Sequence, residues 1–240
     1  MNLPHHLIQE ISKYDYSLMF TLFDAGIPIL PSQCTYKLIK FAVQNHHCKA
    51  MNFGFSHVNL SHSEVEELFE TAVMYGNVNA VRYLYSTYYY SVFNTCSYKS
   101  HYISEYIMYA IQEKYFEVVQ FLLIDRTIEL DYQMILEAVE NGNIQLVQDL
   151  LNNPQLDDPS YEGENEALIR AIELGNYDLV NVFCKCPNID IHEPDNEPIK
   201  VAIDYGETKI VRLLFQDRWV KATLQLDSEQ IHTLKRILVM

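Results

Sequence analysis

The sequence has few glycines and few basic residues, and it lacks the long apolar runs typical of membrane proteins. Only 7 of its 240 residues are glycine, and 17 are lysine or arginine against 32 that are aspartate or glutamate. The net charge of −15 disfavours nucleic-acid binding, because phosphate contacts need cations. No apolar run reaches the roughly 18 residues of a transmembrane helix, so we expect no membrane insertion.

Disulfide, secretion and catalytic signatures are also missing from the sequence. The five cysteines are an odd number and lack the spacing of a disulfide framework. No basic region followed by an apolar stretch begins the chain, so we expect no signal peptide and an intracellular, cytoplasmic location. Phosphate-binding glycine loops, His-Glu-x-x-His and Gly-x-Ser-x-Gly do not occur. We therefore expect no enzyme activity, no cofactor and no metal.

One pattern occurs three times between Ile135 and Phe215. Its copies start at Ala138, Ala171 and Ala202, which lie 33 and 31 residues apart. A glycine follows each alanine after four residues, and an apolar residue with a valine follows after eight. A fixed period of this length predicts stacked supersecondary units, each of which buries its apolar face only against neighbouring copies.

The first of these copies shows the physical reason for the pattern. Ile135, Ala138 and Val139 are spaced for one face of a short helix, and the small alanine allows a neighbouring helix to approach. Gly142 falls where the chain must leave that helix in a left-handed conformation. Leu146 and the apolar residues after it then form the stripe of a second helix. The pattern therefore predicts a helix-turn-helix unit.

Fainter copies extend the pattern in both directions. They start at Ala42, Ala72 and Ala110, with Lys114 at the glycine position of the third. His46-His47-Cys48 falls on the turn of the first, which favours a turn role over a metal site. Residues 10–23 fit a first, capping copy. After the last repeat, Asp227 with Gln230 is a weak capping box, and Ile231, Leu234 and Leu238 give one apolar face of a terminal helix.

The pattern resembles the ankyrin repeat, whose idealised copy runs T-P-L-H-x-A-A-x-x-G-H-x-x-V-V-x-x-L-L. The copy Glu197–Phe215 keeps most of it, but no copy has the T-P-L-H tetrapeptide. Asn143, Asn176 and Glu207 replace the histidine after the glycine, which calls the hydrogen bonds of the turn into question. The resemblance implies an all-α, ankyrin-like helix-turn-helix solenoid of about six to seven repeats with a C-terminal capping helix. We expect one domain over residues 1–240, with an N-terminal capping repeat at 1–34, repeats at 35–218 and a C-terminal cap at 219–240.

Two features are candidates for partner binding. Half of the 18 tyrosines lie between Tyr83 and Tyr109, around an insertion that lengthens one repeat step to 38 residues. Residues 129–199 hold 16 acidic residues and only two basic ones, which favours a basic protein partner. The alternative readings are packing at an irregular repeat junction and solvated loops. The predicted partner contacts are Tyr88, Tyr89, Tyr90, Asp157, Asp158, Glu193 and Asp195.

The cysteines are candidates for a zinc site or for a catalytic nucleophile. Cys184-Lys185-Cys186 with His192 is too tight for structural zinc and lacks a fourth ligand, so a buried structural thiol is the favoured interpretation of Cys184. Cys34 or Cys96 with one of the histidines is conceivable as nucleophile and base, but no local signature supports it.

The sequence therefore predicts a monomeric, non-enzymatic scaffold that binds a protein through its concave face and loop tips. Its degenerate repeats are similar in style to ankyrin proteins of intracellular bacteria and large DNA viruses, which implies a host-directed effector in the host cell. Two alternatives stay open. Leu3–Ile11 resembles the start of an F-box, which implies an adaptor for a ubiquitin ligase. An enzyme in the N-terminal third would instead need a separate fold around Cys34, Cys48 and His57.

Overall fold

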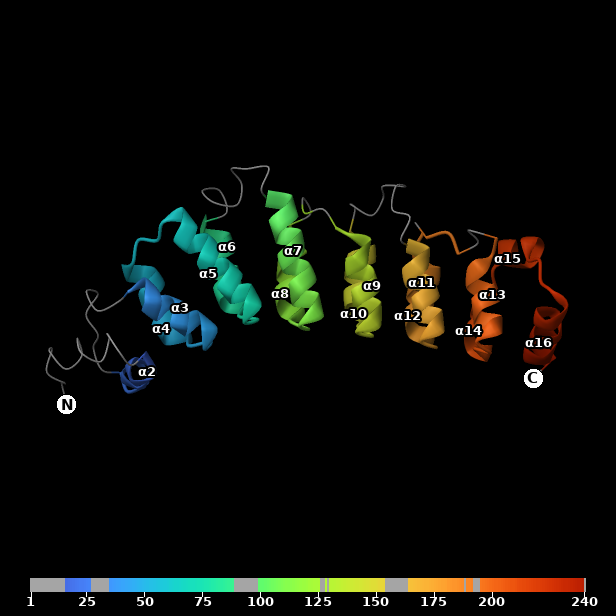
Figure 1. Cartoon of the computed structure of the whole chain (residues 1–240), viewed down its shortest axis with the longest axis horizontal. Helices are drawn as coiled ribbons and strands as arrows, with labels where there is room; N and C mark the ends of the chain where they lie inside the picture. Colours follow the sequence, from blue (N-terminus) through green and yellow to red (C-terminus); the bar gives the residue numbers. More distant parts are fainter. Residues whose placement is uncertain are drawn as a thin grey trace, which may run out of the picture. The chain divides into compact units, whose positions relative to one another are not determined.

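The computed structural model describes most of the chain as helices joined by short turns (Figure 1). The described residues are 16–26, 35–88, 99–125, 128, 130–153, 164–187, 189–191 and 195–239. Within these ranges every regular element is an α-helix. This confirms the all-α prediction for the described part of the chain.

The chain divides into two compact units. Unit 1 comprises residues 1–110 and 117–121, and unit 2 comprises residues 111–116 and 122–240. The described helices of unit 1 are α2 (Tyr16–Asp24), α3 (Tyr36–Gln44), α4 (Cys48–His57), α5 (His62–Met74) and α6 (Val78–Tyr88). The division runs through α7 (Lys99–Gln112) and α8 (Phe116–Leu122).

Unit 2 continues with further helix pairs. They are α9 (Tyr132–Glu140) with α10 (Ile144–Leu151), α11 (Glu164–Glu173) with α12 (Tyr177–Lys185), and α13 (Glu197–Asp204) with α14 (Thr208–Leu214). The unit ends with α15 (Arg218–Thr223) and α16 (Ser228–Val239). The first helices α9, α11 and α13 pack side by side, as do the second helices α10, α12 and α14 (Figure 1).

The alanines that mark the repeats are fully buried in the core. Ala42, Ala72, Ala110, Ala138, Ala171 and Ala202 have no exposed surface at all. Because alanine has no side chain beyond Cβ, adjacent helices can approach closely there, while the larger apolar residues of the second helices fill the remaining space. Burial of one such Leu or Val stabilises the fold by about 1.5–3 kcal/mol.

The same alanines close each turn through their carbonyl groups. In five of the described pairs the alanine carbonyl accepts the amide N–H five residues later; the donors are His47, Asn77, Asn143, Asn176 and Glu207. The residue before each donor gives its own N–H to the residue after the alanine, as Gly142 does to Val139 at 2.9 Å. This pair of bonds is the Schellman motif, which needs a left-handed residue at the glycine position.

Every described glycine-position residue has that left-handed conformation. Gly142 has φ +66°, and the non-glycine residues His46 and Lys114 have φ 55° and 63° at the equivalent positions. The prediction that Lys114 stands at a glycine position, and that His46 belongs to a turn, is therefore confirmed. A residue with a Cβ is strained in the left-handed region. The repeat fold therefore holds His46 and Lys114 in a backbone conformation that their residue types disfavour.

Asparagine takes over the role of the idealised histidine after the glycine. Asn143 and Asn176 each accept the N–H of the third residue of the following helix, at 3.1 and 3.2 Å, and so cap it. His47 caps α4 in the same way through its Nδ1 atom. Glu207 makes no capping bond from its side chain. The turn hydrogen bonds that the sequence called into question are thus present in the copies with asparagine.

Candidate interaction surface

Two of the seven predicted partner contacts fall on described residues. Tyr88 is the last residue of α6 and is half-buried, and this burial raises the pKa of its hydroxyl. Asp195 is exposed in the turn before α13 and has φ 51°. Tyr89, Tyr90, Asp157, Asp158 and Glu193 lie outside the described residues, and all seven contacts stay predictions.

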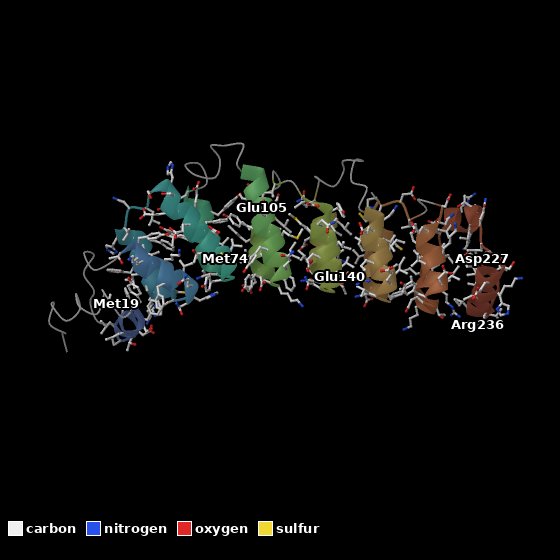
Figure 2. All side chains as sticks on the ribbon, in the orientation of Figure 1. Met19, Met74, Glu105, Glu140, Asp227 and Arg236 are labelled. Carbon is white, nitrogen blue, oxygen red and sulfur yellow. The ribbon has the colours of Figure 1, made fainter. Side chains whose placement is uncertain are left out.

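The first helices of unit 2 carry a row of polar contacts from one repeat to the next. Arg170 of α11 donates to Glu140 of α9 and to Glu173 on its own helix. Both carboxylates favour the charged guanidinium, so they raise the pKa of Arg170, with Glu140 the larger cause. Tyr205, just after α13, donates from its hydroxyl to Glu173 at 3.4 Å. Figure 2 shows Glu140 near the end of α9, beside the turns.

The row continues onto the last helix. The Gln230 amide of α16 donates to both carboxylate oxygens of Asp204, at 2.9 and 3.1 Å. Asp227 accepts the N–H groups of Glu229 and Gln230 and caps this helix, while its own N–H bonds to the Gln230 side chain. The predicted capping box is therefore present. Arg212 of α14 donates to the Ile237 carbonyl near the C-terminal end of α16, where a cation is favourable.

The part of this row on α9, α11 and α13 is an acidic face on which Arg170 already donates to two carboxylates. Glu140, Glu173 and Asp204 occupy the same position, two residues after the marker alanine, in three successive repeats, and Arg170 is shared between Glu140 and Glu173. An arriving cationic group therefore meets carboxylates that retain accepting capacity, since each carboxylate accepts several hydrogen bonds.

Unit 1 has its own contacts between first helices, with different chemistry. Tyr36 and Lys40 of α3 both donate to Glu67 of α5. Burial and the Glu67 hydrogen bond raise the pKa of Tyr36 above its ordinary value, whereas the pKa of Glu67 is lowered, first by Lys40 and then by Tyr36. At the next turn, His46 Nε2 lies 2.8 Å from the Tyr75 carbonyl oxygen. These contacts hold neighbouring repeats in register.

The described cysteines are Cys48, Cys184 and Cys186, and none of them belongs to a metal-binding cluster of described residues. Cys184 lies in the last turn of α12 and is half-buried rather than fully buried, and desolvation with the Asp217 charge raises its pKa to about 11. A protonated thiol is a poor nucleophile and a poor metal ligand near neutral pH. Within the described ranges, no group of three or more His, Cys, Asp or Glu residues is placed to hold a metal ion. Cys34, Cys96 and His192 lie outside those ranges.

The region of the hypothetical hidden enzyme is helix-paired where it is described. Residues 36–57 form α3 and α4 around a Schellman turn, with Cys48 at the start of α4 and His57 at its end. The His57 Nδ1 atom lies 2.8 Å from the Phe53 carbonyl oxygen of its own helix. The F-box-like segment Leu3–Ile11 lies outside the described residues. Among the described helices, none is both long and apolar enough to cross a bilayer.

The sequence reasoning missed one exposed set of side chains. Leu174 and Tyr205 stand directly before the turn glycines of two adjacent repeats, and Tyr177 begins α12. All three are large apolar or aromatic side chains with substantial exposure. The available signal was the position itself, because the residue before the glycine ends the first helix at the surface, where Asn45 and Asn141 stand in other copies.

Comparison with protein-family models matches part of the chain. Residues 135–224 match the family model described as ankyrin repeats in three copies, a span that runs from within α9 to just past the end of α15. No curated protein matches the chain. Repeats of this family generally mediate protein–protein interaction, and the family is typically non-enzymatic.

Proposed function

Because this chain is an ankyrin-repeat protein across residues 135–224, we propose that it is a non-enzymatic scaffold that binds a basic protein partner. The partner contacts the face made by the first helices and the loop tips of the acidic repeats. The observation that carries the proposal is the row of Glu140, Glu173 and Asp204 at equivalent positions of α9, α11 and α13, in which Arg170 is already paired with Glu140 and Glu173. Electrostatic complementarity of this kind speeds association and selects partners.

The proposal includes a cellular location and an oligomeric state. We propose a monomer that acts in the cytoplasm, without nucleic-acid or membrane binding, and that forms one repeat domain over residues 1–240 with caps at 1–34 and 219–240. The degenerate repeats support a host-directed effector role. Tyr88, Tyr89, Tyr90 and the acidic residues Asp157, Asp158, Glu193 and Asp195 are its proposed partner contacts.

The test is capture of a partner by the immobilised chain at low and high salt, followed by mass spectrometry. One variant reverses the charge of Asp157, Asp158, Glu193 and Asp195 to lysine. A matched control variant makes the same change at four exposed acidic residues elsewhere, namely Glu66, Glu70, Glu113 and Glu117.

At low salt, we expect the native chain and the control variant to retain a basic partner. The first variant should lose it. High salt should release it, because exposed charges more than about 10 Å apart are screened at 0.1 M ionic strength and above. Equal loss from both variants would show that binding follows net charge alone and would contradict the proposed site.

A further inference from the structure

The edge of unit 2 that carries the glycine turns has an apolar patch. We define the turn edge as residues 173–178 and 204–209, the turns of α11/α12 and α13/α14. Leu174 is 45% exposed, Tyr177 39% and Tyr205 57%. Single exposed apolar side chains are ordinary, but these three occupy the turns of neighbouring repeats.

Two contacts join the two turns into one surface. Tyr205 donates to Glu173, the residue directly before Leu174. The Glu207 carboxylate lies over Gly175, since a Cβ on that glycine would stand 2.9 Å from the Glu207 Oε1 atom. Leu174 is therefore flanked on both sides by contacts from the next repeat. The packing of α11 against α13 and of α12 against α14 keeps the turns adjacent (Figure 1).

The rim of this patch is negative. The turn edge contains four carboxylates, those of Glu173, Asp178, Asp204 and Glu207, and one ammonium, that of Lys209, while Arg170 from outside these segments donates to Glu173. Asp178 and Asp204 are exposed, and Glu207 is half-exposed. An aromatic and aliphatic centre with an acidic rim is complementary to a cationic group that also has a flat apolar face.

The turns of unit 1 provide a natural comparison. Tyr75 stands at the same turn position as Tyr205 and is 46% exposed. The equivalent turn segments, residues 44–49 and 74–79, contain no carboxylate. The exposed tyrosine is thus common to both units, whereas the combination of tyrosine and carboxylate belongs to the turn edge.

We propose that the turn edge binds an arginine-rich segment of a protein partner, an inference that rests on the proposed scaffold function. A guanidinium group stacks on an aromatic face and pairs with a carboxylate through two parallel hydrogen bonds. Tyr177 and Tyr205 supply the rings, and Asp178 and Glu207 supply the carboxylates, since Glu173 already accepts from Arg170 and Tyr205. A lysine ammonium satisfies the charge without the planar stacking, so the site discriminates between the two cations.

The experiment measures binding of two synthetic peptides to the full chain by fluorescence anisotropy. In one peptide arginine alternates with leucine, and in the other lysine replaces arginine. We expect the arginine peptide to bind about five- to tenfold more tightly, the ratio of a cation–π contact of roughly 1 kcal/mol. The double variant Tyr177→Ala with Tyr205→Ala should abolish this preference, and Tyr75→Ala should leave it unchanged.

A third variant separates ring stacking from folding. Tyr177→Phe with Tyr205→Phe keeps both rings and should keep the arginine preference. Equal affinity for the two peptides, absence of binding, or a preference that survives the double alanine variant would each overturn this proposal. A captured partner that depends on the acidic loop residues but ignores Tyr177 and Tyr205 would overturn it while leaving the scaffold function intact.

Discussion

The left-handed residues at the turns show how strongly the repeat geometry constrains single positions. Lys114 has φ 63° where Gly142 has φ 66°, and its side chain is exposed. His46 is in the same conformation, but its ring nitrogen contacts the Tyr75 carbonyl oxygen, so its side chain offsets part of the strain. Lys114 is therefore the cleaner position at which to measure the cost of a Cβ in this turn.

Replacement of Lys114 by glycine should stabilise the protein. The left-handed conformation costs an L-residue about 1–2 kcal/mol, and the greater freedom of glycine in the unfolded chain removes part of the gain. We expect Lys114→Gly to raise the free energy of unfolding by about 1 kcal/mol, measured by thermal unfolding followed by circular dichroism. The mirror experiment is Gly142→Ala, where no atom lies within 4 Å of the new Cβ, so that only the backbone conformation is tested. A loss of stability in Lys114→Gly would mean that its side chain stabilises the turn.

At the scale of the helix pair, the residue after the turn links two repeats as well as capping a helix. Asn77 accepts the Ala80 N–H at 3.1 Å, and its amide donates to the Val43 carbonyl of the preceding repeat at 2.8 Å. Asn77 is buried, whereas Asn143 at the equivalent position is half-exposed. Asparagine therefore caps a helix in both copies, and at Asn77 it also bonds to the preceding repeat.

We expect the two asparagines to respond unequally to truncation. Asn143→Ala removes a cap and should cost about 1 kcal/mol. Asn77→Ala removes a cap and also leaves the buried Val43 carbonyl without that donor, so we expect a loss of about 2–3 kcal/mol in urea unfolding. Asn77→Asp separates the two roles, because the carboxylate can still cap but cannot donate. If Asn77→Asp were as stable as the native chain, the bond to Val43 would contribute nothing.

The helix pairs were predictable from sequence because their constraints are local and repeated. Ala138 with Gly142 fixes where one helix ends and the turn begins, and the same spacing located the turn at Lys114 without a glycine. The contacts between repeats were less predictable. Arg170 donates to Glu140, which precedes it by 30 residues in the sequence. Nothing in the local pattern around either residue selects that partner. The turn positions of Leu174 and Tyr205 indicate exposure, but which side chains of the next repeat lie beside them depends on stacking.

The charge of the whole molecule is unevenly shared between its two units. Unit 1 holds 9 acidic and 6 basic residues, a net charge of −3, and unit 2 holds 23 acidic and 11 basic residues, a net charge of −12. Like charges concentrated in one compact unit repel one another and destabilise it. A basic partner would relieve this repulsion, so stability and binding should respond to the same charges.

Salt should therefore stabilise unit 2. The single tryptophan, Trp219, belongs to α15, so its emission reports on this unit. An increase in NaCl from 0.1 to 1 M shortens the screening length from about 10 to about 3 Å, and we expect the Trp219-monitored melting temperature to rise by about 2–4 °C. A variant with Asp157→Asn, Asp158→Asn, Glu162→Gln and Glu164→Gln should start from a higher melting temperature and gain less from salt. An identical gain in this variant would show that NaCl acts through apolar burial and not through these carboxylates, and the acidic repeats would then carry no electrostatic strain for a partner to relieve.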